Sequence, residues 1–133
     1  MSTQMILDND AASLWFHSDT RIIHHKFKKF VRGDDIRNVL DAGYEALKAN
    51  GAQKWLSDDR NNSAIPAEDE EWAKTNWFPR VVAAGWKYWA ICLPEKVVGQ
   101  MNMKRYAEAY KEAGITANFF SDPDVALKWL EAQ

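Results

Sequence analysis

The hydrophobic positions near the start of the chain fall in two short segments that are rich in β-forming residues. These segments, 13–17 and 21–27, flank the turn-prone Ser18-Asp19-Thr20 and together predict a β-hairpin. The apolar spacing then becomes helical. The positions that share one helix face are Ile36, Val39, Leu40, Gly43, Tyr44 and Leu47. Asn50-Gly51 ends this helix, because both residue types tolerate a left-handed backbone.

Strands and helices alternate through the rest of the chain. A strand over about 52–57 precedes the acidic run 68–71, which favours the first turn of a helix. Pro79 is expected to kink or restart that helix, which ends at Gly85. The remaining predicted elements are a strand at 87–93, a helix over about 100–113, a strand at 115–120 and a last helix that opens at Asp122-Pro123.

This order of elements predicts a single α/β domain over residues 1–133. Strands that alternate with helices favour a parallel sheet with right-handed crossovers. We therefore expect a mostly parallel five-stranded sheet with an antiparallel hairpin at its N-terminal end and about four helices. The composition is 47% hydrophobic, which is enough for a core without disulfides or bound metal.

Three stretches in this order of elements resemble bacterial STAS-like proteins, which are relatives of the anti-sigma-factor antagonists. The stretches are WFPR at 77–80, AGWKYWAICLPE at 84–95 and FSDPDVALKWL at 120–130. The resemblance implies a small sheet flanked by helices, and a regulatory or ligand-sensing role rather than catalysis.

Family members that act as phosphorylation switches carry an Asp-Ser-x-Gly motif where the third strand meets its helix. This chain has Leu56-Ser57-Asp58-Asp59-Arg60 at that position and departs from the motif. The two carboxylates would repel a phosphate on Ser57, whereas a phosphate on Ser63, nearer the helix start, would be less opposed. The resemblance therefore implies the fold more directly than the partner-switch mechanism.

The polar run after the third predicted strand is the main candidate for a binding site, because ligands of open α/β sheets collect at the carboxyl ends of strands. An aromatic ring and a second guanidinium come from the next helix. The candidate ligand- or partner-binding residues are Ser57, Asp58, Asp59, Arg60, Asn61, Trp77 and Arg80. The alternative is that one aspartate caps a turn and Arg60 pairs with a carboxylate in solvent. The adjacent aspartates point in different directions and make a poor metal cage.

Two adjacent histidines, His24 and His25, fall within a predicted strand. Neighbours on a strand point to opposite faces, so the pair cannot chelate one ion together, although His17 on the neighbouring strand is able to approach one of them. We interpret all three as structural and expect neither a metal nor another cofactor. A pH-sensitive interface is the alternative.

A basic cluster with interleaved Phe27 and Phe30 follows these histidines. It consists of Lys26, Lys28, Lys29 and Arg32. Nucleic acid or anionic lipid is one possible partner, but the formal net charge of −2 argues against a general nucleic-acid binder. We prefer a solvated strand edge, where lysines discourage edge-to-edge pairing.

The single cysteine and the chain's start bear on its location. Cys92 lies in the apolar run 88–93, which indicates a buried, inert thiol, and one cysteine cannot form an internal disulfide. The first ten residues lack the pattern of a secretory signal, and no apolar stretch approaches the ~20 residues that span a bilayer. We predict a cytoplasmic protein without a membrane span.

Seven tryptophans are the compositional outlier: Trp15, Trp55, Trp72, Trp77, Trp86, Trp89 and Trp129. Several must lie in the core. If the crossovers place most helices on one face of the sheet, aromatic residues stay exposed on the other, as at partner or ligand surfaces. This reasoning predicts a symmetric homodimer, and the alternative is that all seven are internal.

Two functions follow from these observations. The first is a non-enzymatic, STAS-like regulatory or sensing module that acts through protein–protein or small-ligand binding. The alternative is a small-ligand-binding protein or enzyme that uses the loop 57–62 with Trp77 and Arg80. The sequence contains no P-loop, dinucleotide glycine pattern, serine elbow or metalloprotease motif, so the enzyme is the less favoured function.

Overall fold

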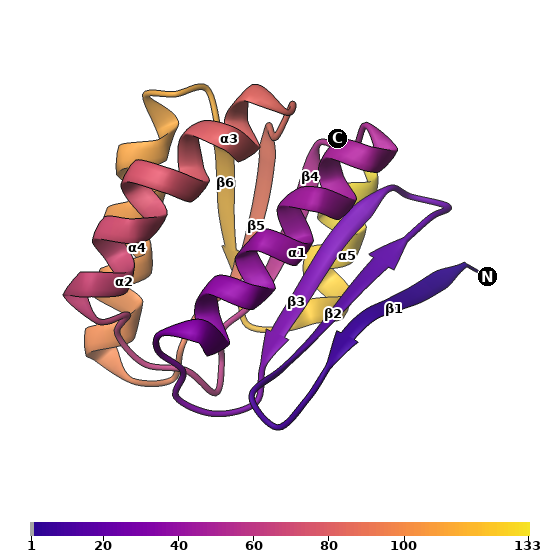
Figure 1. Ribbon diagram of the computed structural model, residues 1–133. Coiled ribbons are helices and arrows are strands. Elements are labelled where there is room, and N and C mark those ends of the chain that lie inside the picture. Colours follow the sequence, from indigo (N-terminus) through magenta and orange to yellow (C-terminus); the bar gives the residue numbers. More distant parts are fainter. Residues whose placement is uncertain (1) are drawn as a thin grey trace.

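The computed structural model describes residues 2–133, and Figure 1 shows a mixed sheet flanked by helices. The strands are β1 Thr3–Asp8, β2 Ala12–His17, β3 Ile22–Phe27, β4 Lys54–Asp58, β5 Tyr88–Cys92 and β6 Thr116–Phe120. The helices are α1 Asp34–Asn50, α2 Ala67–Trp72, the π-helix η1 Ala73–Trp77, α3 Phe78–Ala83, α4 Val97–Lys111 and α5 Pro123–Glu131. Because α2, η1 and α3 run on without a break, the described residues form four helical segments.

The sheet has the order β1-β2-β3-β4-β5-β6, and its strands pair antiparallel from β1 to β3 and parallel from β3 to β6. The α/β class and the antiparallel hairpin β2–β3 are confirmed. The prediction of five strands is wrong, because Thr3–Asp8 adds a sixth. Its side chains are mostly exposed and its pairing slips between Met5 and Leu7, so it lacks the apolar pattern that marks a strand.

Successive crossovers place three helical segments on the same face of the sheet. Since each parallel strand is added on the same side of the last, crossovers of one hand put α1, α2–η1–α3 and α4 together. Of the helices in residues 2–133, α5 alone covers the opposite face (Figure 1). There Ala126 and Leu130 form a buried cluster with Ile22, Leu56 and Ala90.

Helix α1 carries the apolar face that its sequence predicts, and it ends at Gly51 in a left-handed conformation (φ 60°). Gly43 allows this helix to approach β4 closely. A Cβ at position 43 would collide with the far edge of the Trp55 ring, 2.7 Å from its Cζ2. The close contact of α1 with the sheet therefore depends on a missing side chain.

The predicted interruption of the second helix is present as the π-helical turn η1, which ends two residues before Pro79. Proline has no N–H for the carbonyl of Thr75, so the regular ladder breaks there. Trp77, at the end of η1, is buried. Helix α4 begins at Val97, three residues before its predicted start.

The interpretation of the basic cluster as a strand edge is wrong. Lys26 lies on β3, which is inside the sheet between β2 and β4, and the edges are β1 and β6. The Lys28 ammonium donates to the Asp8 carboxylate of the edge strand at 2.8 Å. This lysine therefore holds the end of β1 rather than guarding an open edge.

The tryptophans divide between the two faces. Trp55, Trp77, Trp86 and Trp89 are buried beneath the helices, whereas Trp15, Trp72 and Trp129 are half-buried. Trp15 lies on the opposite face, which α5 covers only over the parallel strands. Trp15 is therefore partly exposed, but this face is not left bare as a whole. Among residues 2–133, no helix has the length and apolar character needed to cross a membrane.

Replacing Gly43 with alanine tests the close approach of α1. We expect Gly43→Ala to lower the free energy of unfolding by about 1–3 kcal/mol through overpacking, although alanine favours helices more than glycine does. Urea unfolding measures this change. In the Trp55→Phe background the smaller ring should accept the new Cβ, so the same substitution should cost less. An equal loss in both backgrounds would show that the Trp55 contact is not the cause.

Candidate functional site

A cavity of about 510 Å³ lies between the sheet and the helices on its α1 face. Its walls come from β3, β4 and β5 below and from α1, α2, η1, α3 and α4 above. The volume is within the range of small-molecule sites in proteins. The site therefore lies where the helix layer meets the sheet, with the polar run after β4 contributing one part of its wall.

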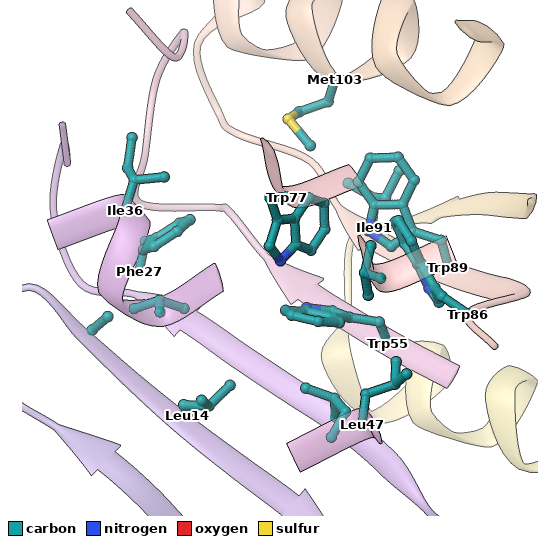
Figure 2. Packing of buried hydrophobic residues seen from close by; sticks show 14 of the residues in the cluster. Leu14, Phe27, Ile36, Leu47, Trp55, Trp77, Trp86, Trp89, Ile91 and Met103 are labelled. Atoms are coloured by element: carbon teal, nitrogen blue, oxygen red, sulfur yellow. The ribbon is translucent and has the colours of Figure 1, made fainter. Parts of the chain in front are cut away.

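Aromatic rings form a large part of the cavity wall. The ring centroids of Trp55 and Trp77 are 5.4 Å apart at an interplanar angle of 89°, and those of Trp86 and Trp89 are 5.3 Å apart at 67°. Figure 2 shows these four indoles gathered above the sheet, with Met103 reaching in from α4. The rings of Phe78, Tyr106 and Tyr110 extend the wall.

Each of these four indole N–H groups has a partner in the chain. Trp77 donates to the carbonyl of Leu40 at 2.8 Å, and Trp86 to that of Tyr88 at 3.0 Å. Trp89 donates to Ser57 Oγ at 2.8 Å. Trp55 donates to a histidine of the polar wall. These bonds fix the ring orientations, and the indoles contribute ring surface rather than N–H groups to the cavity.

The polar part of the wall is built by His25, Ser57 and Asp59. His25 and Ser57 are register partners on the parallel strands β3 and β4, so both side chains face the helices. The Trp55 indole donates to His25 Nδ1 at 3.0 Å, and His25 Nε2 lies 2.9 Å from Asp59 Oδ1. Because an indole N–H can only donate, Nδ1 holds a lone pair and the ring proton is on Nε2, from which it is donated to Asp59.

Tyr106 adds a buried phenol to the same cavity. Its hydroxyl lies close to the side chains of Asn102 and Glu70, without a hydrogen bond of good geometry to either. Burial, reinforced by the charge of Glu70, raises the Tyr106 pKa to about 12, so the phenol stays neutral at pH 7. Burial also raises the pKa of Tyr110. Two neutral phenols therefore line the α4 side.

The structure brings together Ser57, Asp59 and Trp77 of the predicted site residues. Asp58 and Arg60 form a bidentate pair with each other, at 2.9 Å for both guanidinium nitrogens, outside this cavity. Burial opposes ionisation of Asp58, but Arg60 outweighs it and lowers the Asp58 pKa. Arg60 thus pairs with a carboxylate, as in the alternative interpretation of the run, but Asp58 is buried rather than in solvent.

The other two predicted residues lie away from the cavity. Asn61 is exposed, and the adjacent Asn62 is the buried amide, accepting from the N–H of Val31 at 3.2 Å. Arg80 donates to Asp41 at 2.8 Å and stacks over the Tyr44 ring. Arg80 therefore ties α3 to α1 on the surface.

Sequence reasoning missed several residues of the wall. It placed His24 and His25 on opposite faces of the strand, as the structure does, but it could not tell which face the helices cover. Trp89 was considered only among the seven tryptophans, and Tyr106 and Tyr110 were not considered as site residues. A signal for the two tyrosines was their spacing of four residues, which places them on one face of the predicted helix.

Ser57 is buried, with 4% of its surface exposed, and its oxygen accepts the Trp89 indole N–H. A kinase cannot reach this hydroxyl in the folded chain. Ser63 is half-buried. The buried Cys92 lies on the α5 face, where burial and the charge of Asp58 raise its pKa to about 12, so the thiol is unreactive at neutral pH.

On the opposite face of the sheet, His17 does approach His24, as the sequence allowed. Its Nε2 lies 3.0 Å from His24 Nδ1. Burial, with help from the neighbouring histidines, lowers the His24 pKa to about 3, and burial lowers that of His17. The described part of the chain has no group of three or more His, Cys, Asp or Glu side chains suited to a metal ion.

These histidines predict a loss of stability in mild acid. Between pH 6.5 and 3, His24 is protonated in the unfolded chain and neutral in the native chain. The contribution of neutral His24 to the free energy of unfolding is therefore complete above pH 6.5 and is lost as the pH falls toward 3. One such group gives a slope of up to about 1.4 kcal/mol per pH unit. Urea unfolding from pH 7 to 5 should show a smaller slope for His24→Gln. An unchanged slope would exclude His24 as its source.

Comparison of the chain with protein-family models, with curated proteins and with solved structures found no match. The STAS-like resemblance therefore remains a prediction, and the site is argued from its own geometry.

Proposed function

We propose that the protein is a non-enzymatic sensing module of STAS-like type that binds a small, mainly apolar molecule in the aromatic cavity. The observation that carries the proposal is the cavity itself: about 510 Å³, lined mainly by aromatic and aliphatic side chains, with a smaller number of polar and charged groups on its wall. Apolar walls supply affinity and a few fixed polar groups supply orientation.

The arrangement of the walls supports a sensing role. Residues of the α2–η1–α3 segment and of α4 form the upper wall, and residues of β3, β4 and β5 form the lower one. A molecule in the cavity contacts both layers at once and stabilises their docking. Binding would then alter the surface of the helix layer, which is the surface available to a protein partner.

The alternative is an enzyme that uses Ser57, and the favouring observation is that Ser57, His25 and Asp59 line one cavity. A general base must accept the serine proton on a ring nitrogen. In this structure Nδ1 of His25 accepts from Trp55 and Nε2 faces Asp59. Ligand binding therefore fits the hydrogen bonds better than nucleophilic catalysis does.

The homodimer stays a second, independent proposal. Met5 is 51% exposed on the edge strand β1 and is the register partner of the half-buried Trp15 on β2. Both belong to the part of the sheet that α5 leaves open, where a second copy of the chain would bury them.

Filling the cavity tests the proposed function. Ala73 and Ala109 line it, so Ala73→Leu and Ala109→Leu should weaken binding of the neutral probe 2-(2-naphthyl)ethanol at least about tenfold, because each added side chain occupies the space of the ring. Isothermal titration calorimetry at pH 7 measures the affinity, and the melting temperature of the free protein reports folding.

Ala49→Leu is the matched control, since Ala49 is exposed on α1 and does not line the cavity. It should bind the probe as the unmodified protein does. Equal affinity of the filled variants and the control, or no binding of aromatic probes by the unmodified protein, would contradict the proposed function.

A further inference from the structure

Three carboxylates line the cavity, and two of them have positive partners within the chain. Asp69 accepts the backbone N–H of Gly33 at 2.9 Å and lies 3.4 Å from Arg37 Nη2. Both oxygens of Glu70 accept from Arg105 at 3.1 Å. The chain therefore already balances these two charges.

Asp59 is the third carboxylate, and its charge has no such balance. Its side chain is 4% exposed, and its ion-pairing contact among residues 2–133 is His25. The Trp55 indole holds a lone pair on His25 Nδ1, so this ring is neutral when it makes both bonds. A buried carboxylate without a cation is costly, and a bound cation would offset that cost.

The walls around Asp59 suit a positive charge as well. Beside the four buried indoles, the partly buried rings of Phe78, Tyr106 and Tyr110 line the cavity, and aromatic faces attract organic cations. A hard metal ion needs about six oxygen ligands. Asp59 and Ser57 alone supply too few on this part of the wall. An organic cation fits the site better than a metal does.

We propose that the cavity binds an organic ammonium: a protonated alkylamine on an aromatic or similarly apolar body. The ammonium donates to the Asp59 carboxylate, and the body packs against the aromatic wall. The buried Tyr106 hydroxyl, close to Asn102 and Glu70, offers a second hydrogen-bonding position for a polar group on that body. This inference rests on the proposed function and names the chemical class of its ligand.

A matched ligand series tests the inference on the unmodified protein. The probes are 2-(2-naphthyl)ethylamine, 2-(2-naphthyl)ethanol and 2-naphthylacetate, which differ mainly in the charge of one end. Calorimetry at pH 7 should show the amine binding at least about tenfold more tightly than the alcohol, with the carboxylate weakest. Tighter or equal binding of the alcohol would overturn the inference but leave the proposed function standing. Binding of none of the three would overturn both.

The Asp59→Asn variant tests whether Asp59 causes the preference for the amine over the alcohol. The Asn oxygen can still accept the His25 Nε2 proton, so the variant removes the charge while keeping that hydrogen bond. It should bind amine and alcohol with similar affinity. Asp41→Asn is the control, because Asp41 is a half-exposed partner of Arg80 outside the cavity, and it should keep the full preference. A retained preference in Asp59→Asn, or displacement of the amine by millimolar Ca²⁺, would overturn the assignment.

Discussion

The indole of Trp55 joins the helix layer of this protein to the polar wall of its cavity. Its outer edge fits against the bare backbone of Gly43 on α1, and its ring packs against Trp77 and Trp86. Its N–H donates to His25, which fixes the proton of that ring on the side of Asp59. One side chain thus sets how closely α1 approaches the sheet, how the aromatic wall is oriented and which nitrogen of His25 donates to Asp59.

The cavity depends on a difference in packing between the two faces of the sheet. Three helical segments lie over one face, and they meet the parallel strands through large rings that leave space between them. On the other face, helix α5 covers the parallel strands with small and aliphatic residues such as Ala126 and Leu130. The two adjacent aspartates also differ between the faces. Asp58 forms an ion pair with Arg60 outside the cavity, whereas Asp59 lies in the cavity wall without a cation.

The periodicity of apolar residues in the sequence revealed the elements that bury one face and expose the other. Helix α1 shows its apolar face at helical spacing, and the Asp122-Pro123 start of α5 is visible because Asp122 caps the N–H of Asp124. Strand β1 gave no such signal, since its exposed side chains have no apolar face to repeat. The polar run after β4 was found as a site because strand ends collect polar groups, but alternation along the chain then sent Asp58 and Asp59 to different environments.

The sequence by itself determined the α/β class, the hairpin, the four helical segments and the position of a polar run at the end of a parallel strand. These features depend on local spacing, capping and turn residues, which act between near neighbours in the chain. Only the tertiary structure decided that His25 lies beside Ser57, that Trp77 faces the cavity while Arg80 pairs with Asp41, and that Asp59 lacks a cation. Those outcomes depend on strand register and on which face the helices cover, and both are set by packing between segments far apart in the chain.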